Sequence, residues 1–124
     1  MNVKKLKEAV EILKEDLDGA LLGCDIWPTN TGTSIVGYNP NPKATALFER
    51  VTDYMFKALE GAGFPALDKY YLLDLEGGNL VVVLQFKEGY QWGMLVDSNK
   101  VQLGLLLNVA IPNARKALLE ALND

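Results

Sequence analysis

The sequence predicts an α+β sandwich whose elements follow the order helix, strand, strand, helix, strand, strand, strand, helix. Three segments carry apolar residues at every third or fourth position, which is typical of amphipathic helices. Five shorter segments are rich in Val, Leu, Ile and Tyr and are bounded by turn residues, which is typical of strands. Because tight turns join neighbouring strands, we expect one five-stranded antiparallel sheet.

The amino-terminal part of the chain predicts a helix followed by two strands. The helix is expected to stop at Gly19, and its core face consists of Val3, Leu6, Val10, Leu13 and Leu17. Residues 20–27 are apolar almost throughout, which predicts a strand covered on both faces. Turn residues at 28–32 separate it from a second strand at 33–39, which ends before Pro40.

Residues 43–62 predict the middle helix, with Pro42 at its entry. We assign its continuous apolar stripe to the core: Ala44, Leu47, Phe48, Val51, Met55, Ala58, Leu59 and Ala62. Phe56 lies off this stripe, on a second flank with Thr45 and Thr52. A helix with one buried stripe and a spare aromatic flank is expected to pack against its own sheet and against a second surface.

The carboxy-terminal half predicts three strands and a helix. The strands are expected at 69–75, 80–86 and 91–96, joined by turns. Asp97 or Ser98 is expected to cap a last helix that runs to about Leu122. Pro112 would normally interrupt it. The apolar phase nevertheless continues through the proline, so we predict a single kinked helix.

The third strand is predicted to be an unprotected edge. The first, fourth and fifth strands are mostly apolar and should be central, which leaves the second and third at the edges and requires helices on both faces. Edge strands normally carry prolines, charges or bulges that prevent pairing with another chain. Residues 70–73 carry none of these, whereas the second strand contains Gly37 and is followed by Pro40.

These two features predict a two-fold dimer in which third strands pair and middle helices pack beside each other. The predicted interface residues are Thr45, Thr52, Phe56, Tyr70, Tyr71, Leu72 and Leu73. In the alternative interpretation, Phe56 is an isolated exposed aromatic residue and a loop covers the strand.

The residue types argue against catalysis. The chain has no histidine and one cysteine, which excludes Ser-His-Asp and Cys-His arrangements, an internal disulfide and a multi-thiolate zinc site. Cys24 is expected to be a core thiol, and Asp25 to have a structural role or, alternatively, to contact a ligand. Arg50 and Arg115 are interpreted as solubilising residues rather than arginine fingers. No catalytic, cofactor or metal site is predicted, and we expect the protein not to be an enzyme.

Charge and composition argue against two classes of partner. The net charge of −4 and the scattered basic residues argue against nucleic acid or an anionic membrane as the main partner. No apolar run approaches the roughly 20 residues of a membrane helix, and no signal-peptide region is present. We expect a single cytoplasmic domain over residues 1–124.

The sequence resembles the Roadblock / dynein light-chain superfamily. The resemblance rests on element order and on six segments: 17–22 (LDGALL), 32–35 (GTSI), 70–73 (YYLL) paired with 81–84 (VVVL), and 92–97 (WGMLVD) leading into 100–104 (KVQLG). It implies a five-stranded antiparallel sheet with the middle helix on one face and the terminal helices on the other. It also implies homodimers or heterodimers joined through the middle helix and third strand. The turn at 28–32 is longer than is common in the family.

Members of this superfamily serve as dynein subunits, as scaffolds for small GTPases and, in bacteria, as regulators of Ras-like GTPases. The leading hypothesis is therefore a non-catalytic dimeric regulator or scaffold that binds a Ras-like small GTPase or another cytoplasmic partner. The alternative is a small-molecule sensor domain of the PAS or profilin-like kind, with a ligand between sheet and helix. The scarcity of polar residues at inward positions disfavours that alternative.

Overall fold

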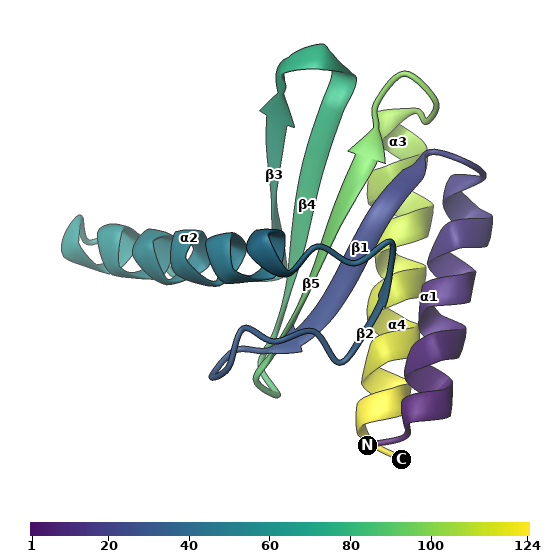
Figure 1. Cartoon of the computed structure of the whole chain (residues 1–124). Helices are drawn as coiled ribbons and strands as arrows, with labels where there is room; N and C mark the ends of the chain where they lie inside the picture. Colours follow the sequence, from purple (N-terminus) through teal and green to yellow (C-terminus); the bar gives the residue numbers. More distant parts are fainter.

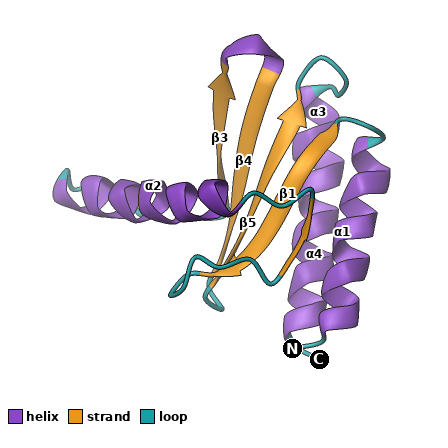
Figure 2. Ribbon diagram, viewed as in Figure 1, coloured by secondary structure: helices purple, strands orange, loops and turns teal.

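A computed structural model describes all 124 residues and shows a five-stranded antiparallel sheet with helices on both faces (Figure 1; Figure 2). The sheet order is β2-β1-β5-β4-β3, which confirms the predicted central and edge strands. The elements before the last helix are α1 (Val3–Leu17), β1 (Leu21–Pro28), β2 (Val36–Tyr38), α2 (Pro42–Gly61), β3 (Tyr70–Leu75), the 3-10 turn Glu76–Gly78, β4 (Asn79–Phe86) and β5 (Tyr90–Asp97). Of these, β2 is shorter than the predicted strand at 33–39.

The last helix is continuous from α3 (Leu103–Leu105) through a π-helical stretch (Leu106–Ala110) to α4 (Ile111–Leu122). Pro112 lies directly after the π-helical stretch with its ring exposed. In this stretch the N–H of Ile111 donates to the carbonyl of Leu106, five residues back, so the turn is wider than in an α-helix. Pro112, which has no backbone N–H to donate, follows this wider turn. The prediction of one helix through Pro112 is confirmed.

The predicted cap of this helix is wrong. The helix begins at Leu103, after an extended Gln102. Asp97 instead accepts the N–H of Asn99 at 2.9 Å, and the hydroxyl of Ser98 donates to the carbonyl of Gly78 at 3.0 Å. Short polar side chains satisfy nearby backbone groups in turns as readily as at helix starts, so the sequence alone did not distinguish the two uses.

The larger hydrophobic core lies between the sheet and the terminal helices α1 and α4 (Figure 1). The N–H of Asn2 donates to the carbonyl of Ala121 at 2.9 Å, so the two ends of the chain lie together. The fully buried side chains of this core include Leu6, Leu13, Leu17, Ile26, Val82, Leu84, Trp92, Leu106, Ile111 and Leu118.

The middle helix α2 covers the opposite face of the sheet and runs across the strands. Its first residues lie over β1, because the N–H of Asn41 donates to the carboxylate of Asp25 at 3.1 Å. Further along, the hydroxyls of Thr52 and Tyr71 of β3 are 2.9 Å apart. The carboxy-terminal half of α2 then projects past β3 (Figure 1). The predicted placement of the helices, middle helix on one face and terminal helices on the other, is confirmed.

The predicted core stripe of the middle helix is confirmed only in part: Phe48, Val51 and Met55 pack against a smaller core, which consists of Trp27, Tyr71, Val81 and Val83, but they are half-buried. Thr45 and Thr52 are the only buried residues of α2, whereas Leu47 of the stripe is 45% exposed and Ala58 and Ala62 are also exposed. The threonines tolerate burial because their hydroxyls donate to the carbonyls of Pro42 and Phe48 within the helix. The buried face of α2 thus includes the two threonines and only one side of the stripe, and the side with Leu47 and Ala58 is open to solvent.

Replacing Gly93 by alanine is expected to lower the free energy of unfolding by about 1–3 kcal/mol, the usual cost of overpacking. A Cβ at this position of β5 would lie 2.7 and 2.9 Å from carbons of the Trp27 ring. The ring is buried and its single N–H donates to both Glu49 and Gln91, so it has little freedom to move. Urea denaturation measures the change. Gly104→Ala is the control, because no atom beyond its chain neighbours and the backbone of its own helix lies within 4 Å of the added Cβ.

Candidate interaction surface

Strand β3 presents free backbone hydrogen-bonding groups at the edge of the sheet. It pairs only with β4, in a register that places Tyr70 opposite Leu84 and Leu72 opposite Val82. The N–H of Gln85 donates to the carbonyl of Lys69. Because ladder bonds alternate along an antiparallel pair, the N–H and C=O groups of Tyr70, Leu72 and Asp74 point away from β4, toward the open edge.

The side chains of β3 alternate between the two layers. Tyr70 and Leu72 are half-buried against the larger core, and Leu73 is half-buried against the smaller core beneath α2. Tyr71 is buried in that smaller core, and burial raises the pKa of its hydroxyl. Since the Thr52 hydroxyl already donates to Phe48, the Tyr71 hydroxyl is the donor in their shared bond.

The predicted interface residues therefore fall into two groups. Thr45, Thr52 and Tyr71 are covered by their own chain, because the face of α2 that carries the two threonines points toward the sheet. Phe56, Tyr70, Leu72 and Leu73 keep part of their surface open to solvent. A second chain would find only this second group accessible.

The projecting half of α2 continues the face that points toward the sheet. At about 100° per residue, Phe56 and Leu59 lie in the same row as Thr45 and Thr52. They come after Thr52, which contacts the edge strand, so their row extends past β3. Both are half-buried rather than buried. The helix therefore presents an apolar underside beyond the edge of its own sheet.

The end of α2 is fixed by a Schellman motif. Gly63 has φ of 75° and its N–H donates to the carbonyl of Glu60, while the N–H of Phe64 donates to that of Leu59. The ring of Phe64 is nevertheless 64% exposed. An aromatic residue on an ordered helix end, without cover from its own chain, is typical of a contact surface.

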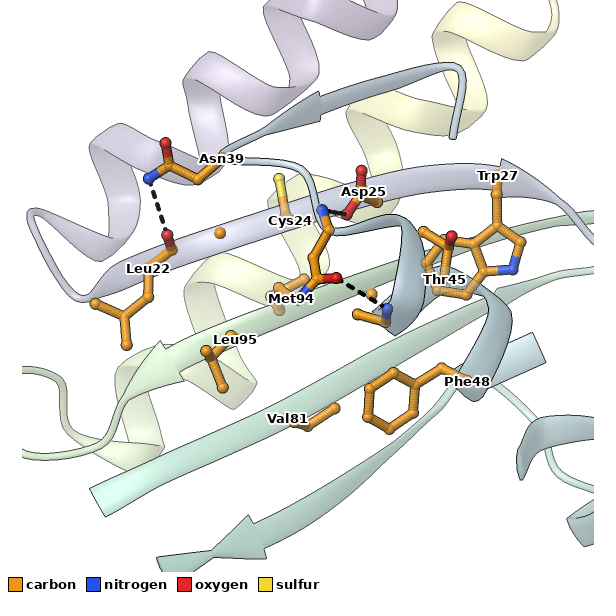
Figure 3. A pocket seen from close by; sticks show the side chains of 14 residues that line it. Leu22, Cys24, Asp25, Trp27, Asn39, Thr45, Phe48, Val81, Met94 and Leu95 are labelled. Carbon is orange, nitrogen blue, oxygen red and sulfur yellow. Dashed lines mark hydrogen bonds between the residues drawn. The ribbon is translucent and has the colours of Figure 1, made fainter. Parts of the chain in front are cut away.

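A cavity of about 180 Å³ lies beside the start of α2, between the helix and β1, β4 and β5 (Figure 3). Its walls are mostly apolar and come from Leu22, Gly23, Cys24, Asp25, Trp27, Asn39, Asn41, Ala44, Thr45, Phe48, Val81, Gly93, Met94 and Leu95. The sensor hypothesis would be favoured by a cavity between the sheet and the last helix. The cavity beside α2 lies on the other face of the sheet, whereas a second hollow, between β3, β4 and the start of the last helix, is lined by Leu72, Asp74, Leu80, Ser98, Val101, Leu103 and Leu106.

Asp25 and Cys24 are the two titratable residues of this wall. Asp25 is 5% exposed; one carboxylate oxygen accepts the N–H of Asn41, and the other is buried without a partner. Asp25 thus anchors the start of α2 to β1, in keeping with a structural role. Burial raises the pKa of the Cys24 thiol to about 11. Cys24 is therefore a protonated thiol at neutral pH, and its prediction as a core residue is confirmed.

A chain of polar side chains ties α2 to the sheet. The indole N–H of Trp27 is shared between the carboxylate of Glu49, at 2.9 Å, and the amide oxygen of Gln91, at 2.8 Å. Gln91 in turn donates to Gln85 at 3.0 Å. Burial raises the pKa of Glu49. These side-chain hydrogen bonds were not predicted from the sequence, although Gln85 and Gln91 are opposite each other across the β4–β5 hairpin and the hairpin register was a usable signal.

No group of three or more His, Cys, Asp or Glu side chains is arranged to hold a metal ion. None of the helices combines the length and apolar character needed to cross a membrane. The most distinctive feature of the surface is thus the open strand edge beside the projecting helix.

No model of a known protein family and no curated protein matches the sequence. Solved structures do match the fold. MglB of Myxococcus xanthus aligns with a TM-score of 0.82 and 13% identity, over 98% of this chain and 90% of that chain. The gliding protein MglB of Thermus thermophilus aligns with a TM-score of 0.69 and 14% identity, over 94% and 93%. A Roadblock/LC7 domain from Streptomyces avermitilis aligns with a TM-score of 0.57 and 10% identity, over 89% and 97%. The chain therefore has a roadblock-type fold, and the resemblance predicted from sequence is confirmed at that level.

Proposed function

We propose that this protein is a non-catalytic regulator or scaffold that forms a homodimer through β3 and α2 and binds a Ras-like small GTPase. The observation that carries the proposal is the half of α2 that projects past an open strand edge with an apolar underside. A lone monomer would leave this surface and three outward-facing backbone positions in water. The superfamily resemblance supports the choice of a GTPase as partner.

Geometry favours one register for the dimer. A two-fold axis at Leu72 lets all the outward-facing positions pair, Leu72 with its own copy and Tyr70 with Asp74. Each α2 crosses its strand at Tyr71. This register separates the two crossing points by two residues, about 7 Å, close to the 8–10 Å at which helices pack. An axis at Tyr71 would superimpose the helices, and one at Leu73 would place them about 13 Å apart.

The dimer joins two sheets into one broad platform that carries both α2 helices on one face. A GTPase docked there would be regulated by position, because the platform would hold one conformation of its switch segments in preference to another. The nucleotide site would belong entirely to the GTPase, since this chain has no glycine-rich phosphate loop.

Ras-like GTPases of the same genome, loaded with GDP or with a non-hydrolysable GTP analogue, are expected to bind the immobilised protein in one nucleotide state in preference to the other. A platform that selects a switch conformation must discriminate between states whose switches differ. Pull-down of matched loads measures the preference. The monomeric variant described in the Discussion serves as the control and should capture less GTPase. Absence of binding in both states would contradict the GTPase assignment and leave the dimer untouched.

A further inference from the structure

We infer that the cavity beside the start of α2 is a binding site for a second copy of this chain, whose Phe64 occupies it. The inference rests on the proposed dimer and adds the residue that is inserted, the site that receives it and a separate test. Three observations carry it: the reach of α2, the strand register beneath it, and the match between an exposed ring and an apolar cavity.

The reach of α2 follows from its contacts with its own strands. Asn41 lies over β1 and Thr52 over β3, three strands away. Strands are about 4.8 Å apart and a helix rises about 1.5 Å per residue, so α2 advances roughly three residues per strand. Past β3, the helix therefore passes β3 and β4 of the second copy near Met55 and Leu59. It reaches β5 and β1 of that copy at about Ala62 to Phe64.

The register decides over which part of the second sheet the helix passes. Strand pairing aligns Tyr71, Val83, Gly93 and Asp25 in one row across the sheet, and this row lies under the chain's own α2. The next row consists of Leu73, Val81, Leu95 and Gly23. With the two-fold axis at Leu72, the second copy's helix crosses this next row. Val81, Leu95 and Gly23 of that row line the cavity.

The chemistry of the two surfaces matches. The cavity lies beside Ala44 at the start of α2, and in an antiparallel helix pair the end of one helix lies beside the start of the other. Leu22 and Leu95 at the cavity are 39% and 37% exposed in the single chain. The ring of Phe64 is held out by the Schellman motif and has no cover of its own. Insertion of the ring removes both apolar surfaces from water. It costs little further conformational entropy, because the ring is already held in place.

Cysteine cross-linking tests the inference directly. Phe64→Cys and Leu95→Cys are made in separate chains, one of them tagged, mixed, and oxidised with copper phenanthroline. A disulfide between the two different chains is expected, detected by non-reducing electrophoresis and mass spectrometry. Tyr54→Cys with Leu95→Cys is the matched control and should not cross-link, because Tyr54 lies on the opposite side of α2 from the sheet. Buried Cys24 should not interfere.

Two further measurements separate this inference from the dimer itself. Phe64→Ala should raise the dimer dissociation constant about tenfold or more in ultracentrifugation, and adding Leu95→Ala should cost less than the two single changes combined. If the protein is dimeric but gives no 64–95 disulfide and the two changes are additive, the inference is overturned and the dimer stands. If the unmodified protein is monomeric, both fail.

Discussion

Replacing Phe56 by glutamate is expected to convert the dimer into monomers of 13.6 kDa. Phe56 lies in the row of α2 that faces the sheet, past the edge strand, so in the dimer it would lie against the second copy. A carboxylate buried there without a partner costs at least about 3 kcal/mol, which raises the dissociation constant roughly a hundredfold or more. Light scattering and ultracentrifugation at tens of micromolar measure the loss of mass.

The variant should remain folded, because Phe56 is not part of either core of the single chain. Circular dichroism and urea denaturation check this. Tyr54→Glu introduces the same charge two residues away, at a side chain that is 72% exposed, and should leave the dimer intact. An unchanged mass for Phe56→Glu at these concentrations would remove the helix contact from the proposal.

The sequence predicted which elements form, because period and turn chemistry are local properties of the chain. It also predicted that β3 is an edge, since composition separates strands covered on both faces from others. The buried face that it predicted for α2 was only partly right. Hydrophobic periodicity locates an apolar stripe but does not say which neighbour covers it, and the part of the stripe that contains Leu47 and Ala58 is left open.

Two threonines explain that error. Thr45 and Thr52 looked polar, yet each hydroxyl is satisfied inside the helix, so burial costs them little. In the single chain, Phe48, Val51 and Met55 of the stripe are half-buried against the smaller core. The surplus of apolar surface on this helix was a sound observation. Its assignment to one flank or the other required the three-dimensional structure.

The candidate site could be predicted at the level of elements but not of contacts. The open edge was visible in the sequence as a run at 70–73 without charge or proline. The cavity was not, because it is formed by residues from α2 and three strands whose proximity depends on register. Phe64 gave no periodic signal either, since it lies past the end of its helix and is positioned by a capping motif.

Replacing Leu72 by proline is expected to abolish the dimer while the monomer stays folded. The N–H of Leu72 points away from β4, so its loss removes no bond from the chain's own sheet. In the proposed dimer this residue lies on the two-fold axis, so each copy loses the hydrogen bond that the N–H of Leu72 donates to the carbonyl of Leu72 in the other copy. Both carbonyls are then left unpaired. Proline at the axis also places two rings in the space that the outward-facing N–H groups occupied, against the facing strand. Ultracentrifugation should find monomers, and circular dichroism should find the sheet retained.

Leu72→Ala separates the backbone effect from the loss of the side chain. Alanine keeps the N–H and removes part of a half-buried side chain, so it should weaken the dimer only modestly, whereas proline should eliminate it. A proline variant that remains dimeric would show that the strands do not pair at this edge. The projecting half of α2 would then have to pack against a different surface. The register, the helix spacing and the position of Phe64 would lose their support, because all three are argued from the pairing of the β3 strands.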